Sequence, residues 1–120
     1  MKKSNIRKLD TLWSKRVKEL AGYVCEHCLR NGYEIEPETG AWLNSSHILG
    51  RRYRATRWLL RNGLCLCLNC HQNYDEHGPL EKDIINRCIG DERYQELVEL
   101  AKHSVTKGQV YEEIEGELKK

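Results

Sequence analysis

Two Cys-x-x-Cys pairs constrain this chain more than any other feature of its sequence. Cys25 and Cys28 form the first pair, and Cys67 and Cys70 form the second. A Cys-x-x-Cys turn presents two thiolates to one side, so two such pairs can complete the tetrahedral coordination of one zinc ion. Because four thiolates leave no ligand position open for water, we expect this zinc to hold the fold and to take no part in chemistry.

Two further cysteines and a histidine raise the question of which residues bind the zinc ion. Cys65 and Cys67 could also chelate as a Cys-x-Cys pair, although the Cys-x-x-Cys spacing favours Cys67 with Cys70 and leaves Cys65 as a small apolar side chain. Cys88 occurs at an apolar helical position, which indicates the core. His27 lies between the first two thiols and is expected at the surface, pointing away from the metal. The alternative to zinc is a set of buried or disulfide-bonded cysteines.

The length and composition fit a small domain that needs a metal staple. The chain has 120 residues, no Phe and 32% charged residues, so a single domain with a modest core is expected. No apolar run reaches the length of a membrane span, and the basic residues 1–16 are not followed by the apolar run of a secretory signal. We therefore expect a soluble, cytoplasmic protein, whose reduced thiols favour zinc over disulfides.

The small net charge conceals a gradient along the chain. Residues 1–30 carry eight Lys or Arg and three Asp or Glu, and residues 41–74 contain no acidic residue. Residues 91–120 carry eight Asp or Glu and five Lys or Arg. The basic front and middle suit a polyanion such as DNA, and the acidic tail is expected to face away from it.

Hydrophobic spacing and turn residues predict an α+β domain. Apolar residues at helical spacing indicate helices, a loosely alternating run indicates a strand ending near His47, and Asn62-Gly63 is a strong turn signal. The domain divides into an N-terminal helix (1–22), a zinc-stapled core (23–78) and a C-terminal helical extension (79–120). The expected elements are helices over 6–21, 70–75, 80–89, 92–103 and 109–119, strands over 42–49 and 64–66, and a loop or short hairpin over 33–41.

A histidine, an asparagine and a second histidine occur in a fixed order around the second cysteine pair. Asn62 lies fifteen residues after His47, and His71 lies nine residues after Asn62, directly after Cys70. This order resembles the HNH endonuclease family over residues 25–75. The resemblance implies a ββα-metal core, in the branch of the family whose ββα unit is pinned by a four-cysteine zinc site. It also implies hydrolysis of DNA phosphodiester bonds.

The resemblance implies a role for each position. His47 would be the general base that takes a proton from the attacking water, which suits a neutral imidazole near neutral pH. Asn62 would brace the His47 loop by hydrogen bonds. His71 would bind a catalytic divalent cation, Mg²⁺ or Mn²⁺, and Asp75, one helical turn later, would add a ligand. The plainer alternatives are a loop histidine, a turn residue, and an unused histidine or replacement ligand beside the zinc.

Ser46 departs from the family pattern. Many members carry Asp, His or Glu just before the base as a further metal ligand, and serine is a poor ligand for such a cation. Either the cation relies on His71, Asp75 and water, or the metal preference differs, or the activity is weak.

An arginine-rich segment follows His47. Its arginines are expected to contact phosphates, which positions a nucleic acid without reading its bases. They are Arg51, Arg52, Arg54, Arg57 and Arg61. Tyr53 and Trp58 could stack on an unpaired base, with the core as the alternative for Trp58. Residues 47–58 and 89–97 are similar to the lambdoid phage NinG/Rap recombination endonucleases, which implies branched DNA as a substrate and a bacterial host cell as the location.

The leading hypothesis is a metal-dependent DNA endonuclease with a structural zinc and a catalytic Mg²⁺ or Mn²⁺. The alternative is a zinc-stapled nucleic-acid-binding module without catalysis, which Ser46 favours. A protein-interaction zinc domain is a third hypothesis, and the basic middle of the chain argues against it.

Overall fold

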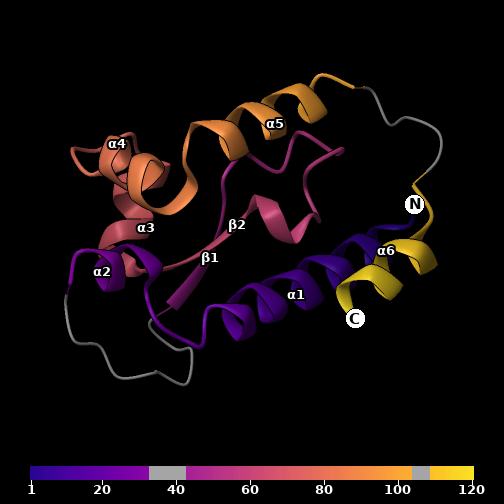
Figure 1. Cartoon of the computed structure of the whole chain (residues 1–120). Coiled ribbons are helices and arrows are strands. Elements are labelled where there is room, and N and C mark those ends of the chain that lie inside the picture. Colours follow the sequence, from indigo (N-terminus) through magenta and orange to yellow (C-terminus); the bar gives the residue numbers. More distant parts are fainter. Residues whose placement is uncertain (33–42, 104–108) are drawn as a thin grey trace.

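The protein is an α+β fold in which two short strands lie among helices (Figure 1). The structure is a computed structural model, and it describes residues 1–32, 43–103 and 109–120. The loop or hairpin expected over 33–41 lies outside the described residues. The helices are α1 (Lys3–Leu20), α2 (Glu26–Arg30), α3 (Leu68–Asp75), α4 (Glu81–Ile84), α5 (Asp91–Ala101) and α6 (Tyr111–Leu118), and the strands are β1 (Leu43–His47) and β2 (Gly63–Cys67).

Two short elements complete the described chain. A 3-10 turn, η1 (Leu60–Asn62), leads directly into β2, and a π-helical turn, η2 (Ile85–Ile89), continues α4. The helix expected over 80–89 is therefore divided between α4 and η2. The helix expected from Cys70 begins earlier, at Leu68, because Cys67 ends β2 and occupies the N-cap position of α3.

The two strands pair antiparallel and place His47 at the end of the sheet. Leu43 lies opposite Cys67, and His47 lies opposite Gly63. Successive side chains along β1 point to opposite faces of the sheet. On one face, Ser45 Oγ donates to the Ser14 carbonyl in α1 (2.7 Å), whereas Ser46 Oγ on the other face contacts His71 in α3. The strand thus brings α1 and α3 to its two sides.

Helix α1 packs across both strands, and α6 lies alongside it (Figure 1). Leu9, Trp13 and Val17 recur every four residues, so they share one face of α1, and all three are buried. Leu118 in α6 is 1% exposed, which shows that the C-terminal helix belongs to the same core.

Gly63 permits the close approach of α1 to β2. Its φ of −118° is ordinary extended backbone, so no turn conformation requires glycine there. A Cβ at this position would lie 2.9 Å from Trp13 Cζ2 and would also overlap the Val17 side chain. The Asn62-Gly63 signal therefore reflects close packing at the start of a strand, and a reversal of the chain does not occur at this dipeptide.

Within the described ranges, the helices are all too short or too polar to cross a lipid bilayer.

Candidate functional site

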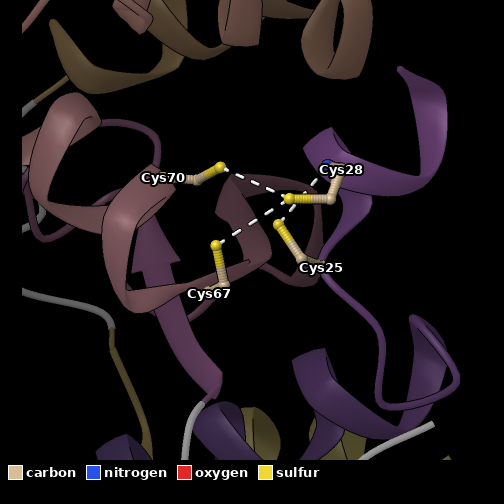
Figure 2. Close-up of side chains that lie close together, drawn as sticks. All are labelled: Cys25, Cys28, Cys67 and Cys70. Atoms are coloured by element: carbon tan, nitrogen blue, oxygen red, sulfur yellow. Dashed lines mark hydrogen bonds between the residues drawn. The ribbon is translucent and has the colours of Figure 1, made fainter. Parts of the chain in front are cut away.

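Four cysteine side chains converge between α2 and the junction of β2 with α3. Cys25 and Cys28 lie at the start of α2, and Cys67 and Cys70 lie at the start of α3. Figure 2 shows the four thiols pointing toward one another, and their sulfur atoms all lie within 4.8 Å of each other. The two Cys-x-x-Cys pairs are therefore brought together as the sequence predicts.

The spacing of the sulfurs fits a tetrahedral zinc ion. Cys28 Sγ lies 3.9 Å from Cys67 Sγ and 3.8 Å from Cys70 Sγ. With a Zn–S bond of roughly 2.3 Å, tetrahedral geometry separates two ligand sulfurs by about 3.8 Å. The four cysteines can therefore hold a zinc ion.

The ionisation of these thiols is coupled to metal binding. Burial and the contact with Cys25 raise the pKa of the Cys28 thiol to about 12. Burial likewise raises the pKa of the Cys70 thiol. Four thiolates this close together repel one another unless a cation neutralises them, so metal binding and loss of thiol protons occur together.

The other two cysteines lie outside the cluster. Cys65 is fully buried in β2 and Cys88 is 5% exposed in η2, and both belong to the hydrophobic core. The structure therefore selects Cys67 over Cys65 for the cluster. Cys67 ends β2 at the turn into α3, beside Cys70, whereas Cys65 lies within the strand and is buried in the core.

The surface position expected for His27 is wrong. Its ring is buried, at 2% exposed, between α2, α3 and α4. The short helix α2 turns this side chain toward the elements that carry the second cysteine pair, which the spacing of the motif alone does not reveal.

His47 is held in a defined orientation at the end of β1. Its ring stacks on the Trp13 indole, with ring centroids 3.9 Å apart and an angle of 10° between the planes. Its Nε2–H donates to the Arg57 carbonyl oxygen at 3.0 Å. In this tautomer Nδ1 carries no hydrogen and is free to accept a proton.

The electrostatic surroundings keep His47 neutral. Burial lowers the pKa of the His47 imidazole below its ordinary value of 6.5, and the Arg51 charge lowers it further. A neutral ring near neutral pH is the form in which an imidazole acts as a base.

Asn62 braces the two residues that follow His47. Its side-chain Oδ1 accepts from Leu49 N–H at 2.9 Å, and its Nδ2 donates to the Leu49 carbonyl at 3.0 Å. Its own carbonyl accepts from Ile48 N–H at 2.8 Å. Tyr74 OH in α3 also donates to the Ile48 carbonyl at 2.7 Å. The chain that leaves β1 is thus fixed from two sides.

Replacing Asn62 by alanine is expected to destabilise the protein by about 2–5 kcal/mol, because two backbone groups of Leu49 lose their partners in a buried position and a cavity remains. Urea denaturation measures the change. The matched control is Asn86→Ala, since Asn86 is exposed in η2 and should change stability by no more than ~0.5 kcal/mol. An equal effect of both substitutions would contradict this role.

His71 and Asp75 lie one turn apart on α3. His71 Nε2 is 3.5 Å from Asp75 Oδ2, and His71 Nδ1 is in hydrogen-bond contact with Ser46 Oγ. When Nδ1–H donates to the serine oxygen, the lone pair of Nε2 is left on the side of the carboxylate. An imidazole nitrogen and a carboxylate oxygen at this separation can share one divalent cation.

His47, His71 and Asp75 line one cavity of about 350 Å³. Asp10 and Arg51 also line it, so both signs of charge are present. Asn62 is fully buried behind the His47 loop and does not reach the cavity. Of the three motif residues, His47 and His71 therefore line the cavity together. Asn62 acts indirectly, through its hydrogen bonds to the backbone that follows His47.

The arginines fall into two groups. Arg51, Arg52 and Arg54 are exposed on the loop after β1, and the first two line a second cavity, of about 620 Å³, that also borders His47 and Asp75. Arg57 instead makes two hydrogen bonds to Asp10, at 3.1 and 2.8 Å, and its side chain is 15% exposed. Arg61 pairs with Glu96 in α5.

Asp10 and Trp13 also line the cavity, although the sequence motif does not include them. Hydrogen bonds from Arg57 and Trp58 hold the pKa of Asp10 below its ordinary value, although burial acts in the opposite direction. Asp10 thereby fixes the loop whose Arg57 carbonyl holds His47. The one available signal was an acidic residue three positions before Trp13, on the apolar side of a basic helix.

The chain was compared with protein-family models, curated proteins and solved structures, and none of them matches it.

Proposed function

We propose that this protein is a metal-dependent DNA endonuclease of the HNH type. The observation that carries the proposal is the cavity shared by His47, His71 and Asp75, beside the exposed arginines of the following loop. The order of β1, β2 and α3, with the four-cysteine cluster at the start of α3, supports a ββα-metal core.

The cavity provides the groups that phosphodiester hydrolysis requires. His47 Nδ1 takes the proton of a water molecule that attacks the scissile phosphate, while Nε2–H stays bonded to the Arg57 carbonyl. His71 and Asp75 would hold a Mg²⁺ or Mn²⁺ ion. Such a cation would neutralise charge on the phosphate and stabilise the leaving 3′ oxygen. The products are then 5′-phosphate and 3′-hydroxyl ends.

The arginine loop would hold the DNA backbone. Arg51, Arg52 and Arg54 are exposed and would contact phosphates, whereas the pairing of Arg57 with Asp10 gives Arg57 a supporting role. Branched recombination or repair intermediates are the proposed substrates because residues 47–58 and 89–97 resemble the phage recombination endonucleases. Such substrates imply action in the cytoplasm, that of a bacterial host if the chain is phage-encoded.

The test is nicking of DNA by the purified protein with Mg²⁺ or Mn²⁺. Supercoiled plasmid reports cleavage of any kind, and a panel of duplex, nicked, flap and four-way-junction DNA reports substrate preference. Cleavage that needs the divalent cation supports the proposal. Binding of DNA with no cleavage under either cation would favour the second candidate, a zinc-stapled nucleic-acid-binding module.

Ser46 is the observation that favours that second candidate. Its hydroxyl contacts His71 Nδ1, away from the Nε2 that faces Asp75, so this position supplies no ligand to a cation held by His71 and Asp75. A nuclease with this serine depends on fewer protein ligands.

Asp75→Asn is expected to raise the Mg²⁺ concentration that gives half-maximal nicking by about tenfold, because it removes the carboxylate charge beside His71 Nε2. Glu76→Gln is the matched control, since Glu76 is the next exposed carboxylate along the chain and lines neither cavity, and its Mg²⁺ dependence should equal that of the wild type. If Asp75→Asn folds normally and keeps the wild-type Mg²⁺ dependence, Asp75 does not hold the cation.

A further inference from the structure

The buried His27 ring makes polar contacts with three side chains, one in α3, one in α4 and one just after α2. Nδ1 lies 3.3 Å from Cys70 Sγ in α3, and Nε2 lies 2.7 Å from Asp83 Oδ2 in α4. Asn31 Nδ2, just after α2, lies 3.2 Å from the same Nε2. Neither the four sulfur ligands nor the proposed nuclease site uses this ring.

The burial of His27 makes its partners necessary. A polar ring at 2% exposure costs free energy unless its nitrogens are hydrogen-bonded. Nε2 has two polar neighbours, Asn31 beside α2 and Asp83 in α4, and the shorter contact, to Asp83, exists only while α4 is docked against α2. The hydrogen bond from His27, together with that from Arg87, lowers the pKa of Asp83, so this carboxylate is an acceptor.

We propose that His27 and Asp83 form an outer layer of the zinc site that couples metal binding to the docking of α4. His27 Nδ1 contacts Cys70 Sγ, and the Asp83 carboxylate contacts Nε2 on the other side of the ring and so orients it. Groups that orient a metal ligand from outside the coordination shell commonly change metal affinity by about 10–100-fold. This inference depends on the zinc site and is independent of the proposed nuclease activity.

The coupling works in both directions. If docked α4 strengthens zinc binding by some factor, bound zinc strengthens the docking of α4 by the same factor. The consequence extends beyond α4, because η2 continues that helix and carries the core residues Cys88 and Ile89. Zinc loss should therefore loosen residues 81–89 in addition to the cysteine cluster itself.

Asp83→Asn tests the outer layer without threatening the fold, since the Asp83 side chain is 41% exposed and asparagine has the same size. Zinc affinity is measured by equilibrium competition with a chromophoric chelator. We expect about tenfold weaker zinc binding. Glu81→Gln is the matched control, because Glu81 is a carboxylate on the same helix that contacts His77 and lies away from His27. Its zinc affinity should equal that of the wild type.

Hydrogen exchange provides the second readout. In the zinc-loaded state, Asp83→Asn should lower the protection of amides in 81–89 relative to the wild type, by the same factor as it lowers zinc affinity. Unchanged zinc affinity in Asp83→Asn would overturn the proposal, and so would an equal loss in Glu81→Gln. Equal protection of 81–89 in the zinc-loaded wild type and the zinc-loaded Asp83→Asn would overturn the coupling to α4.

Discussion

Removal of zinc is expected to unfold most of this chain. Four-thiolate zinc sites in small domains contribute on the order of 10 kcal/mol, whereas a whole domain of this size is stable by only about 5–15 kcal/mol. The metal would therefore supply a free energy comparable to the entire stability of the protein.

The position of the cysteine cluster explains why zinc removal should unfold more of the chain than the cluster itself. Cys25 and Cys28 fix α2, and Cys67 and Cys70 fix the start of α3, so the ion joins segments far apart in the sequence. Without it, only weak thiol–thiol contacts such as that between Cys28 Sγ and Cys70 Sγ (3.8 Å) join the two segments at the cluster. The core that remains is small and contains no Phe.

Far-UV circular dichroism during thermal unfolding, with and without a strong zinc chelator, measures this effect. Cys67→Ala should lose zinc by elemental analysis and lose cooperative unfolding. Cys65→Ala is the matched control, because Cys65 lies on the same strand in the core and should retain one zinc ion per chain. A metal-free chain that unfolds as cooperatively as the zinc-loaded one would contradict the expectation.

His47→Ala is expected to reduce metal-dependent DNA nicking by on the order of 10²–10⁴-fold, the usual contribution of a general base. The ring makes one hydrogen bond, to the Arg57 carbonyl, and stacks on Trp13. Its removal therefore deletes the proton acceptor while the exposed arginines still bind DNA. DNA affinity, measured separately by fluorescence anisotropy, should stay within about twofold of the wild type.

The pH dependence of nicking gives an independent check. Because burial lowers the pKa of His47 below 6.5, the ring remains neutral through the neutral range and becomes charged only at lower pH. The rate should be constant near neutrality and fall as the pH drops through this lowered pKa. In His47→Ala that acidic fall should disappear from whatever activity is left.

His103→Ala is the control for histidine loss in general, because His103 is exposed just after α5 and lines neither cavity. It should nick DNA like the wild type. If His47→Ala retained wild-type nicking with equal DNA binding, the cavity would not be catalytic, and the zinc-stapled binding module would become the better description.

Local patterns in the sequence predicted most of the elements correctly. Helical spacing of Leu9, Trp13 and Val17 identified α1, because that spacing follows from the helix itself and needs no partner. The two cysteine pairs could also be predicted as metal ligands, since a Cys-x-x-Cys turn orients both thiols locally. Boundaries were less predictable: α3 begins before Cys70, and 80–89 is split by a π-helical turn, because neighbouring elements decide where a helix starts and changes pitch.

The sequence by itself determined the four-cysteine cluster and the order of His47, Asn62 and His71, because both are patterns of residue type and spacing. Tertiary structure alone decided which residues surround them. It buried His27 between Cys70 and Asp83, and it brought Asp10 and Trp13 of α1 to the His47 loop. These contacts join residues that lie 34 to 56 positions apart, and no local periodicity encodes a contact at that separation. They form only when the helices pack around the two strands, which is why the environment of the site had to come from the fold.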